Sequence, residues 1–330
     1  GTALGIFGMG NVGSAVTKFI APFVMVAYGW STVAQVWAGA LAVMAVFYYL
    51  FAKDDPVLVE QRLTGARPQS AASQLEPLKK LQVWRFSLYY FFVFGAFVAL
   101  ALWLPRYFVG AYGLPITTAG MLAAAYSIPG SIFRAVGGWL SDKVGARTVM
   151  YWTFGVSAVV TFLLSYPTTH YVVEGVEGPI AFTLAMGVVP FTVLVFILGF
   201  FMSLGKAAVY KHIPVYYPDN VGSVGGLVGM IGGLGGFVLP IAFGALADLT
   251  GVWTSCFMLL FVLVSAALLW MHLAIHRMER RAVPELGSLP ELPEMQGMAG
   301  HAPPRARAAP KRPPVQAARP KLDPGMVPAE

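Results

Sequence analysis

Arg134 is the residue whose type and position point most directly to chemistry. It lies in the run SIPGSIFRAVGGWL, about two helical turns from Asp142, in a segment otherwise almost free of charge. An ionised side chain is expensive inside a membrane, so a residue of this kind is by default a functional-site hypothesis. The guanidinium group is planar, permanently charged and able to donate paired hydrogen bonds, which suits a planar oxyanion. The alternative is an arginine that merely snorkels to the interface.

Lys18 is a second cation in an apolar run. It lies near the middle of the first expected membrane span, two turns from Asn11 on a similar helix face. It could add positive potential to a site, or lose its charge by desolvation and take part in proton coupling. A structural role facing a backbone carbonyl is the alternative.

Glycine dominates the stretch from Gly222 to Pro240, which holds eight glycines and no charge. In water so much glycine favours a loop, because glycine loses the most backbone entropy on ordering. In a membrane the backbone must satisfy its own hydrogen bonds, so the run is expected to be helical. One helix face then carries small residues that let another backbone or a small ligand approach closely; these are Gly225, Gly229, Gly232 and Gly236.

A similar run opens the chain over residues 5–22, GIFGMGNVGSAVTKFIAP. Two glycine-lined helices in separate halves suggest a pseudo-symmetric transporter with a site near the bilayer midplane. The letters Gly8-x-Gly10-x-x-Gly13 also match the dinucleotide-binding fingerprint. That fingerprint needs a preceding strand and an acidic residue about 20 positions later, whereas the first acidic residue here is Asp54. We therefore exclude it.

Composition places these residues in an integral membrane protein. The 330 residues are 57% hydrophobic and 11% charged, with a mean hydropathy of +0.69, whereas soluble domains carry about 25% charged residues. The single cysteine, Cys256, excludes an intrachain disulfide. Runs long enough to cross a bilayer predict an all-α membrane protein with eight spans, at approximately 3–28, 32–52, 83–108, 115–139, 148–166, 180–205, 220–247 and 252–275.

Charge in the connections predicts the topology. Lysine and arginine gather on one side, which is expected to be cytoplasmic, and the other side carries only Arg106. The net charge of +7 resides in loops and in a Pro/Arg-rich tail, residues 277–330, and this tail is expected to be disordered. Because the basic residues are distributed in this way, we expect no nucleic-acid partner. The basic residues assigned to the cytoplasmic side are Lys53, Arg62, Arg67, Lys79, Lys80, Arg85, Lys143, Arg147, Lys206, Lys211 and those of the tail.

The run GGWLSDKVGAR, residues 137–147, resembles the cytoplasmic loop motif of the major facilitator superfamily, with Ala146 at one usually basic position. Asp142, with Lys143 and Arg147 nearby, would form a charge latch; an ordinary charged turn is the alternative. The resemblance implies a twelve-helix bundle that lacks its first four helices here. Its domains would be 1–52, the last two helices of the N-terminal bundle; 53–82, a cytoplasmic loop; and 83–276, the C-terminal six-helix bundle.

Together, the two glycine helices resemble the paired signatures of the nitrate/nitrite porter (NarK-type) family within that superfamily; a generic close-packed helix pair is the alternative. The resemblance implies that Arg134 binds the substrate anion and that Asn11 donates its amide hydrogens to it. It implies further that Tyr90 and Phe94 sandwich the substrate, although packing is an equal alternative. The resemblance also implies a second substrate arginine, in an early helix that is expected to be missing here. The glycines that would line the site are Gly10, Gly13, Gly232, Gly233, Gly235 and Gly236.

These patterns predict a secondary transporter for nitrate and nitrite in the cytoplasmic membrane, working by alternating access. No Asp, Glu or His lies deep in a predicted helix, since His170 and His272 are terminal; exchange is therefore favoured over nitrate/proton symport. A truncated, non-transporting membrane subunit is the alternative from another class. We find no metal-ligand cluster, nucleophile–base pair or phosphate loop, so we expect neither an enzyme nor a cofactor. The expected partners are the two anions, the lipid bilayer and the protein's own missing helices.

Overall fold

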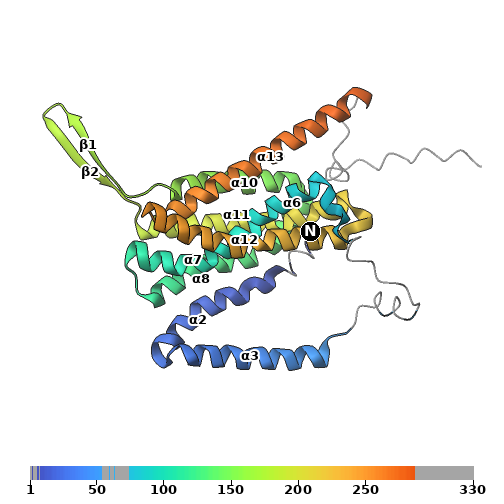
Figure 1. Ribbon diagram of the computed structural model, residues 1–330, viewed down its shortest axis with the longest axis horizontal. Coiled ribbons are helices and arrows are strands. Elements are labelled where there is room, and N and C mark those ends of the chain that lie inside the picture. The colour runs from blue at the N-terminus through green and yellow to red at the C-terminus, as the bar shows by residue number, and fades with distance from the viewer. Residues whose placement is uncertain are drawn as a thin grey trace, which may run out of the picture.

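The computed structural model describes residues 2, 6, 8–53, 59, 63 and 74–286. Within these residues, eight helices are long and apolar enough to cross a membrane, which confirms the predicted number of spans. The helices lie side by side along the long axis of the molecule (Figure 1). The fold is therefore an all-α membrane bundle, apart from one short hairpin.

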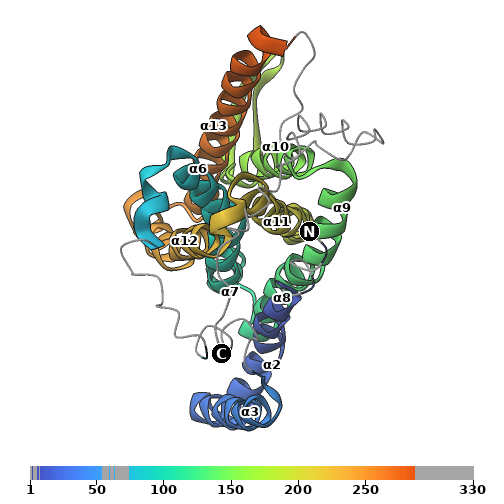
Figure 2. The ribbon, with the colours of Figure 1, turned by 90° about the vertical axis from the view of Figure 1, so that its right-hand side faces the viewer.

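Two helices near the N-terminus form a separate pair. A 3-10 turn, η1 (Met9–Val12), leads into α2 (Gly13–Tyr28), and α3 (Trp30–Phe51) follows after a sharp turn at Gly29, whose φ is 84°. Figure 2 shows the pair at one side of the bundle, where α2 lies along α8 (Ile116–Ile132) and α3 lies outermost. None of the residues of α3 is buried, so its apolar surface is uncovered within the described part of the chain.

The remaining helices form a compact bundle. Its first span is continuous but not uniform, because a π-helical stretch, η3 (Phe91–Ala96), joins two α-helical parts. A small-residue contact brings two of the spans together: a Cβ on Gly95 of η3 would overlap the backbone of Gly232 and Gly235. In chain order after α8, the helices are α9 (Arg134–Val144), α10 (Ala146–Leu164), α11 (Val188–Tyr216), α12 (Val221–Thr250) and α13 (Ser255–Leu286); before it come α6 (Leu81–Tyr90), η3 (Phe91–Ala96) and α7 (Phe97–Tyr112).

The fourth span is broken at Phe133, four residues after Pro129. Pro129 has no N–H and removes a helical hydrogen bond to the preceding turn. The peptide N–H of Phe133 still bonds the Pro129 carbonyl at 3.0 Å. α8 then ends at Ile132, and α9 begins at Arg134.

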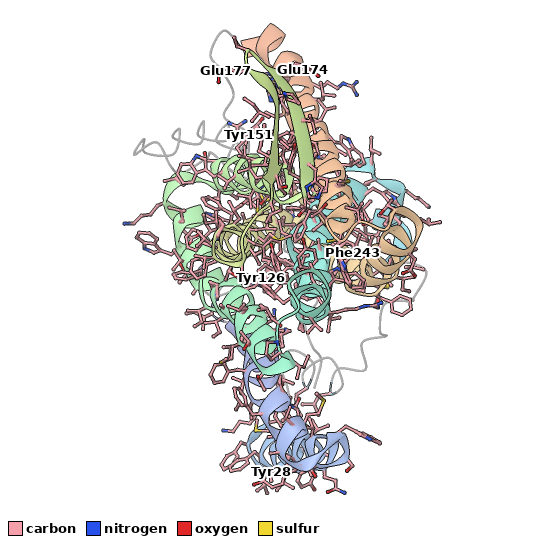
Figure 3. All side chains as sticks on the ribbon, turned by 90° about the vertical axis from the view of Figure 1, so that its left-hand side faces the viewer. Tyr28, Tyr126, Tyr151, Glu174, Glu177 and Phe243 are labelled. Carbon is pink, nitrogen blue, oxygen red and sulfur yellow. The ribbon has the colours of Figure 1, made fainter. Side chains whose placement is uncertain are left out.

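An antiparallel hairpin, β1 (Thr169–Gly175) and β2 (Gly178–Leu184), was not expected from the sequence. It projects from one end of the bundle, at the left of Figure 1. Its tip carries Glu174 and Glu177, labelled in Figure 3. Because residues 178–184 form a strand, the sixth span begins at Val188 and not at 180.

Two helices are longer than predicted, and this corrects the placement of Lys206. α11 continues to Tyr216 without a break at residue 205, so Lys206 lies inside a helix and not in a cytoplasmic connection. α13 runs to Leu286, so residues 277–286 of the expected tail are helical. The rest of that tail lies outside the described residues.

Candidate functional site

Arg134 is the first residue of α9, directly after the break, and its side chain is only 6% exposed. It interacts electrostatically with the side chain of Tyr90. Its Nε atom is buried and has no hydrogen-bond partner among the described residues. A buried donor without a partner is costly, so this guanidinium retains capacity for a further acceptor.

Two tyrosines, Tyr90 and Tyr210, interact electrostatically with that guanidinium. Tyr90 ends α6, and its ring stacks on Phe94 at 5.0 Å between centroids, with an angle of 11° between the planes. The ring of Tyr210, from α11, meets Tyr90 edge-on at 4.8 Å. Tyr90 is buried, whereas Phe94 is half-buried. Three elements thus place a planar cation next to a stacked aromatic pair.

The glycines of α12 hold this aromatic pair in place. A Cβ on Gly232 would lie 2.5 Å from Cδ1 of the Tyr90 ring and 3.0 Å from its backbone carbonyl carbon. Gly235 is equally close to the backbone of η3, and Gly236 lies against Val98. At Gly233 the nearest side-chain atom, from Phe94, is 4.0 Å away. These glycines therefore act first as a close-packing surface for α6 and η3.

The N-terminal glycines lie in a different environment. A Cβ on Gly10 or Gly13 would meet no described atom within 4 Å. Gly8 is buried, and a Cβ there would overlap the side chain of Arg134. Asn11 follows in η1, half-buried, with its backbone oxygen accepting a bond from Ser14. Gly8 was not predicted as a site residue from the sequence. It leaves room for the Arg134 side chain, which packs against it from the main bundle.

Lys18 reaches across to the main bundle. Its Nζ donates to Oγ of Ser127 in α8, at 3.1 Å, and its side chain is half-buried. A Cβ on Gly120 would lie 2.7 Å from the carbonyl oxygen of Lys18, so α2 and α8 pack closely around it. The position links the two parts of the molecule at the level of the broken span.

Lys206 is the site residue that the sequence did not reveal. Its side chain is fully buried, and its Nζ donates to the carbonyl oxygen of Gly130 at 2.9 Å. It lies within electrostatic range of both Arg134 and Lys18. In the sequence, Lys206 and Lys211 together suggest the basic end of a helix. The only feature that argues against a helix end there is that no proline occurs before Pro214.

Acidic side chains are scarce in the described membrane spans. Among the described spans, Asp142 and Asp248 are each third from the end of their helix. His212 corrects the prediction that the spans hold no histidine away from their ends. The longer α11 includes it four residues before the helix end, where its side chain is buried and stacked on Phe86. Three cations therefore gather where no described carboxylate balances them.

The predicted latch residues do not all come together. Asp142 accepts an ion pair from Lys211 of α11 at 2.9 Å and hydrogen bonds from the backbone N–H and side-chain hydroxyl of Thr2. Lys143 instead lies over the ring of Trp139, 4.1 Å from its centroid. Arg147 begins the next helix, in the first turn of α10. Asp142 thus connects the N-terminal segment to α11.

Comparison with known families and proteins gives one consistent result. The family profile described as the Major Facilitator Superfamily matches residues 1–173 and 115–319. The solved structure of a transporter of that superfamily, FucP in the outward conformation, resembles this fold with a TM-score of 0.50 at 16% identity, covering 78% of this chain and 59% of that one.

Curated relatives carry names connected with nitrate or nitrite. A probable nitrate/nitrite antiporter NarK1 from Thermus thermophilus is 43% identical over 291 residues, which is 83% of this chain and 64% of that protein. A nitrite extrusion protein from Bacillus subtilis is 30% identical, covering 82% and 63%. A probable nitrate transporter NarT from Staphylococcus haemolyticus is 31% identical, covering 79% and 61%. The chain spans just under two thirds of the length of these relatives.

Proposed function

We propose a function from the premise that this chain belongs to the Major Facilitator Superfamily, whose profile matches most of its length. The chain is then part of a transporter rather than of an enzyme, and its apolar helices make it a multi-pass membrane protein. We place it in the cytoplasmic membrane, with Asp142, residues 53–82 and the C-terminal tail on the cytoplasmic side. The lipid bilayer is then its surroundings.

The substrates that we propose are nitrate and nitrite, carried by exchange. The observation that carries this proposal is the buried Arg134 with its unpartnered Nε beside Tyr90. A planar monoanion matches this donor geometry, and the stacked Tyr90–Phe94 pair offers a flat apolar surface beside it. The names of the curated relatives support the same substrates.

Alternating access would operate between two bundles. We propose that residues 1–52 supply the last two helices of the first bundle, 53–82 the connection and 83–276 the second bundle. The uncovered faces of α2 and α3 fit further helices of the whole protein. The contacts from Gly8 to Arg134, from Lys18 to Ser127 and from the N-terminal segment to Asp142 cross this boundary, so they must rearrange in each cycle.

A non-transporting membrane subunit is the alternative from another class. A helix that only anchors a protein gains nothing from a buried guanidinium, which is costly to keep without an acidic partner. Arg134, Lys18 and Lys206 together make that cost larger. The three cations therefore favour an anion transporter.

Gly8→Ala is expected to weaken substrate binding without unfolding the protein. The added methyl group overlaps the Arg134 side chain, which is flexible and can yield, so the guanidinium moves while the helices stay. We expect the KM for nitrate in full-length proteoliposomes to rise about tenfold, equivalent to about 1.4 kcal/mol. Gly39→Ala, in α3, is the matched control, since no described atom lies within 4 Å of its new methyl group. Equal KM values in the two variants would contradict the contact.

Lys18 allows exchange to be distinguished from symport. If exchange is correct, vesicles loaded with nitrite take up external nitrate without any imposed proton gradient. Lys18→Arg should then keep a rate within about threefold of wild type, a difference below 1 kcal/mol, because arginine keeps the charge and can still donate to Ser127. Lys53→Arg, outside the spans, is the control.

Symport predicts the opposite result in the same vesicles. Uptake would require an inward proton gradient and would proceed into vesicles without internal nitrite. Lys18→Arg would stall the cycle if Lys18 carries the proton, because a guanidinium does not deprotonate. Gradient-dependent uptake into empty vesicles, lost in Lys18→Arg but kept in Lys53→Arg, would overturn exchange. No nitrate uptake by the wild-type protein in either arrangement would overturn the proposed transport function itself.

A further inference from the structure

The proposed function gives Lys206 no individual task beyond its charge, although it is the most deeply buried cation among the described residues. Its side chain has no exposed surface. An ammonium group without water or an acidic partner is expensive to bury, and the groups recorded around it are a carbonyl oxygen and aromatic rings. Such a cost suggests that the contact it makes is needed.

That contact is made at the end of a helix. Gly130 lies in the last turn of α8, where backbone carbonyls lack the donors that a continuing helix would supply. Nζ of Lys206 supplies a donor to one of them, at 2.9 Å, and a cation is favoured at the negative end of a helix dipole. The amine and the ammonium forms can both donate this bond. Lys206 therefore caps α8 in either protonation state.

The ring of Phe97 completes the arrangement. Nζ of Lys206 lies 3.0 Å from its centroid, and the ring of Tyr126 stacks on it at 4.9 Å; Figure 3 shows Tyr126 within the packed helices. A Cβ on Gly130 would overlap the same ring. We call Lys206, Gly130, Phe97 and Tyr126 the break cluster. It brings three spans together immediately before the break at Phe133.

We propose that Lys206 is a positioning residue for the anion site. By holding the end of α8 at Gly130, it fixes the direction in which α9 leaves the break, and Arg134 is the first residue of α9. Arg134 is then held against Tyr90 before substrate arrives, and binding needs no further ordering of that helix. This inference rests on the proposed anion site, and its structural half can be tested without substrate.

The test uses Lys206→Met in the full-length protein in lipid nanodiscs. Methionine has a similar length and cannot donate, and replacing a buried charge with an apolar group is often neutral for overall stability. We expect an unchanged melting temperature, but hydrogen–deuterium exchange at least about tenfold faster over residues 131–138, reflecting local opening. Exchange in α10 should stay as in wild type. Lys79→Met, an exposed lysine in η2 (Glu76–Lys79), is the matched control. If Lys206→Met does not fold, Lys206→Gln is measured in the same way.

Transport gives the second readout. Because Lys206 acts through Arg134, we expect the KM for nitrate to rise about tenfold with Vmax within about threefold, the pattern of lost binding rather than lost turnover. Unchanged hydrogen–deuterium exchange over residues 131–138 would overturn the positioning role of Lys206. Faster hydrogen–deuterium exchange with an unchanged KM for nitrate would overturn it as well. If the wild-type protein transports no nitrate but Lys206→Met still shows faster hydrogen–deuterium exchange over residues 131–138, the proposed transport function fails. The role of Lys206 in holding the end of α8 then stands.

Discussion

Arg134→Lys is expected to abolish most nitrate/nitrite exchange by the full-length protein while leaving its expression and melting temperature intact. Lysine keeps the charge but loses the planar pair of donors that a planar oxyanion requires. Losing one hydrogen bond to a charged group costs about 1.5–3 kcal/mol, which corresponds to a loss of about tenfold or more in kcat/KM. Counterflow of nitrate into nitrite-loaded proteoliposomes measures it.

Arg106→Lys is the matched control for that substitution. Arg106 is exposed near the end of α7, with its guanidinium carbon 5.1 Å from the ring centroid of Trp103. Arg106→Lys makes the same chemical change outside the proposed site, so the nitrate/nitrite exchange rate of this variant should equal that of wild type. Arg134→Lys transporting as fast as Arg106→Lys would remove Arg134 from the substrate site.

Gly232→Leu is expected to stop transport by a different route. Already the first added carbon would lie 2.5 Å from the Tyr90 ring and 3.0 Å from Tyr90 backbone, a spacing that forces the two helices apart. Overpacking of a well-packed contact typically costs about 1–3 kcal/mol, and here it also displaces the aromatic pair beside Arg134. We expect exchange below detection and a lower melting temperature.

Gly226→Leu, in the same helix, separates packing from helix propensity. Its added carbon meets no described atom within 4 Å, and leucine is the better helix former by roughly 1 kcal/mol or less. That variant should transport normally and melt no lower than wild type. Normal transport by both variants would show that the α12 glycines do not form the contact described for them.

The helical architecture follows from the sequence because membrane spans are set by hydropathy over about 20 residues. The boundaries are less determined. Residues 180–184 are as apolar as a span, yet Ile180, Phe182 and Leu184 alternate along a strand paired with residues 169–173. Beyond residue 205, two lysines suggest a helix end, but α11 continues to Tyr216 because Lys206 finds an internal partner.

The site is predictable only where a residue is unusual by itself. Arg134 and Lys18 can be singled out from the sequence, since each is a cation in an apolar run. Gly8 and Lys206 depend on partners more than 70 residues away, and no local pattern in the sequence indicates those contacts. The ion pair of Lys211 with Asp142 is likewise not indicated by any local pattern in the sequence.

The β1–β2 hairpin makes the sidedness of reconstituted vesicles measurable. Val176 at its tip is fully exposed, whereas Cys256, the single cysteine of this sequence, is buried. A cysteine introduced at Val176 is therefore open to a membrane-impermeant maleimide on one face of the bilayer, and Cys256 stays unlabelled. The labelled fraction before and after lysis counts the molecules in each orientation, so that a transport rate can be assigned to one direction.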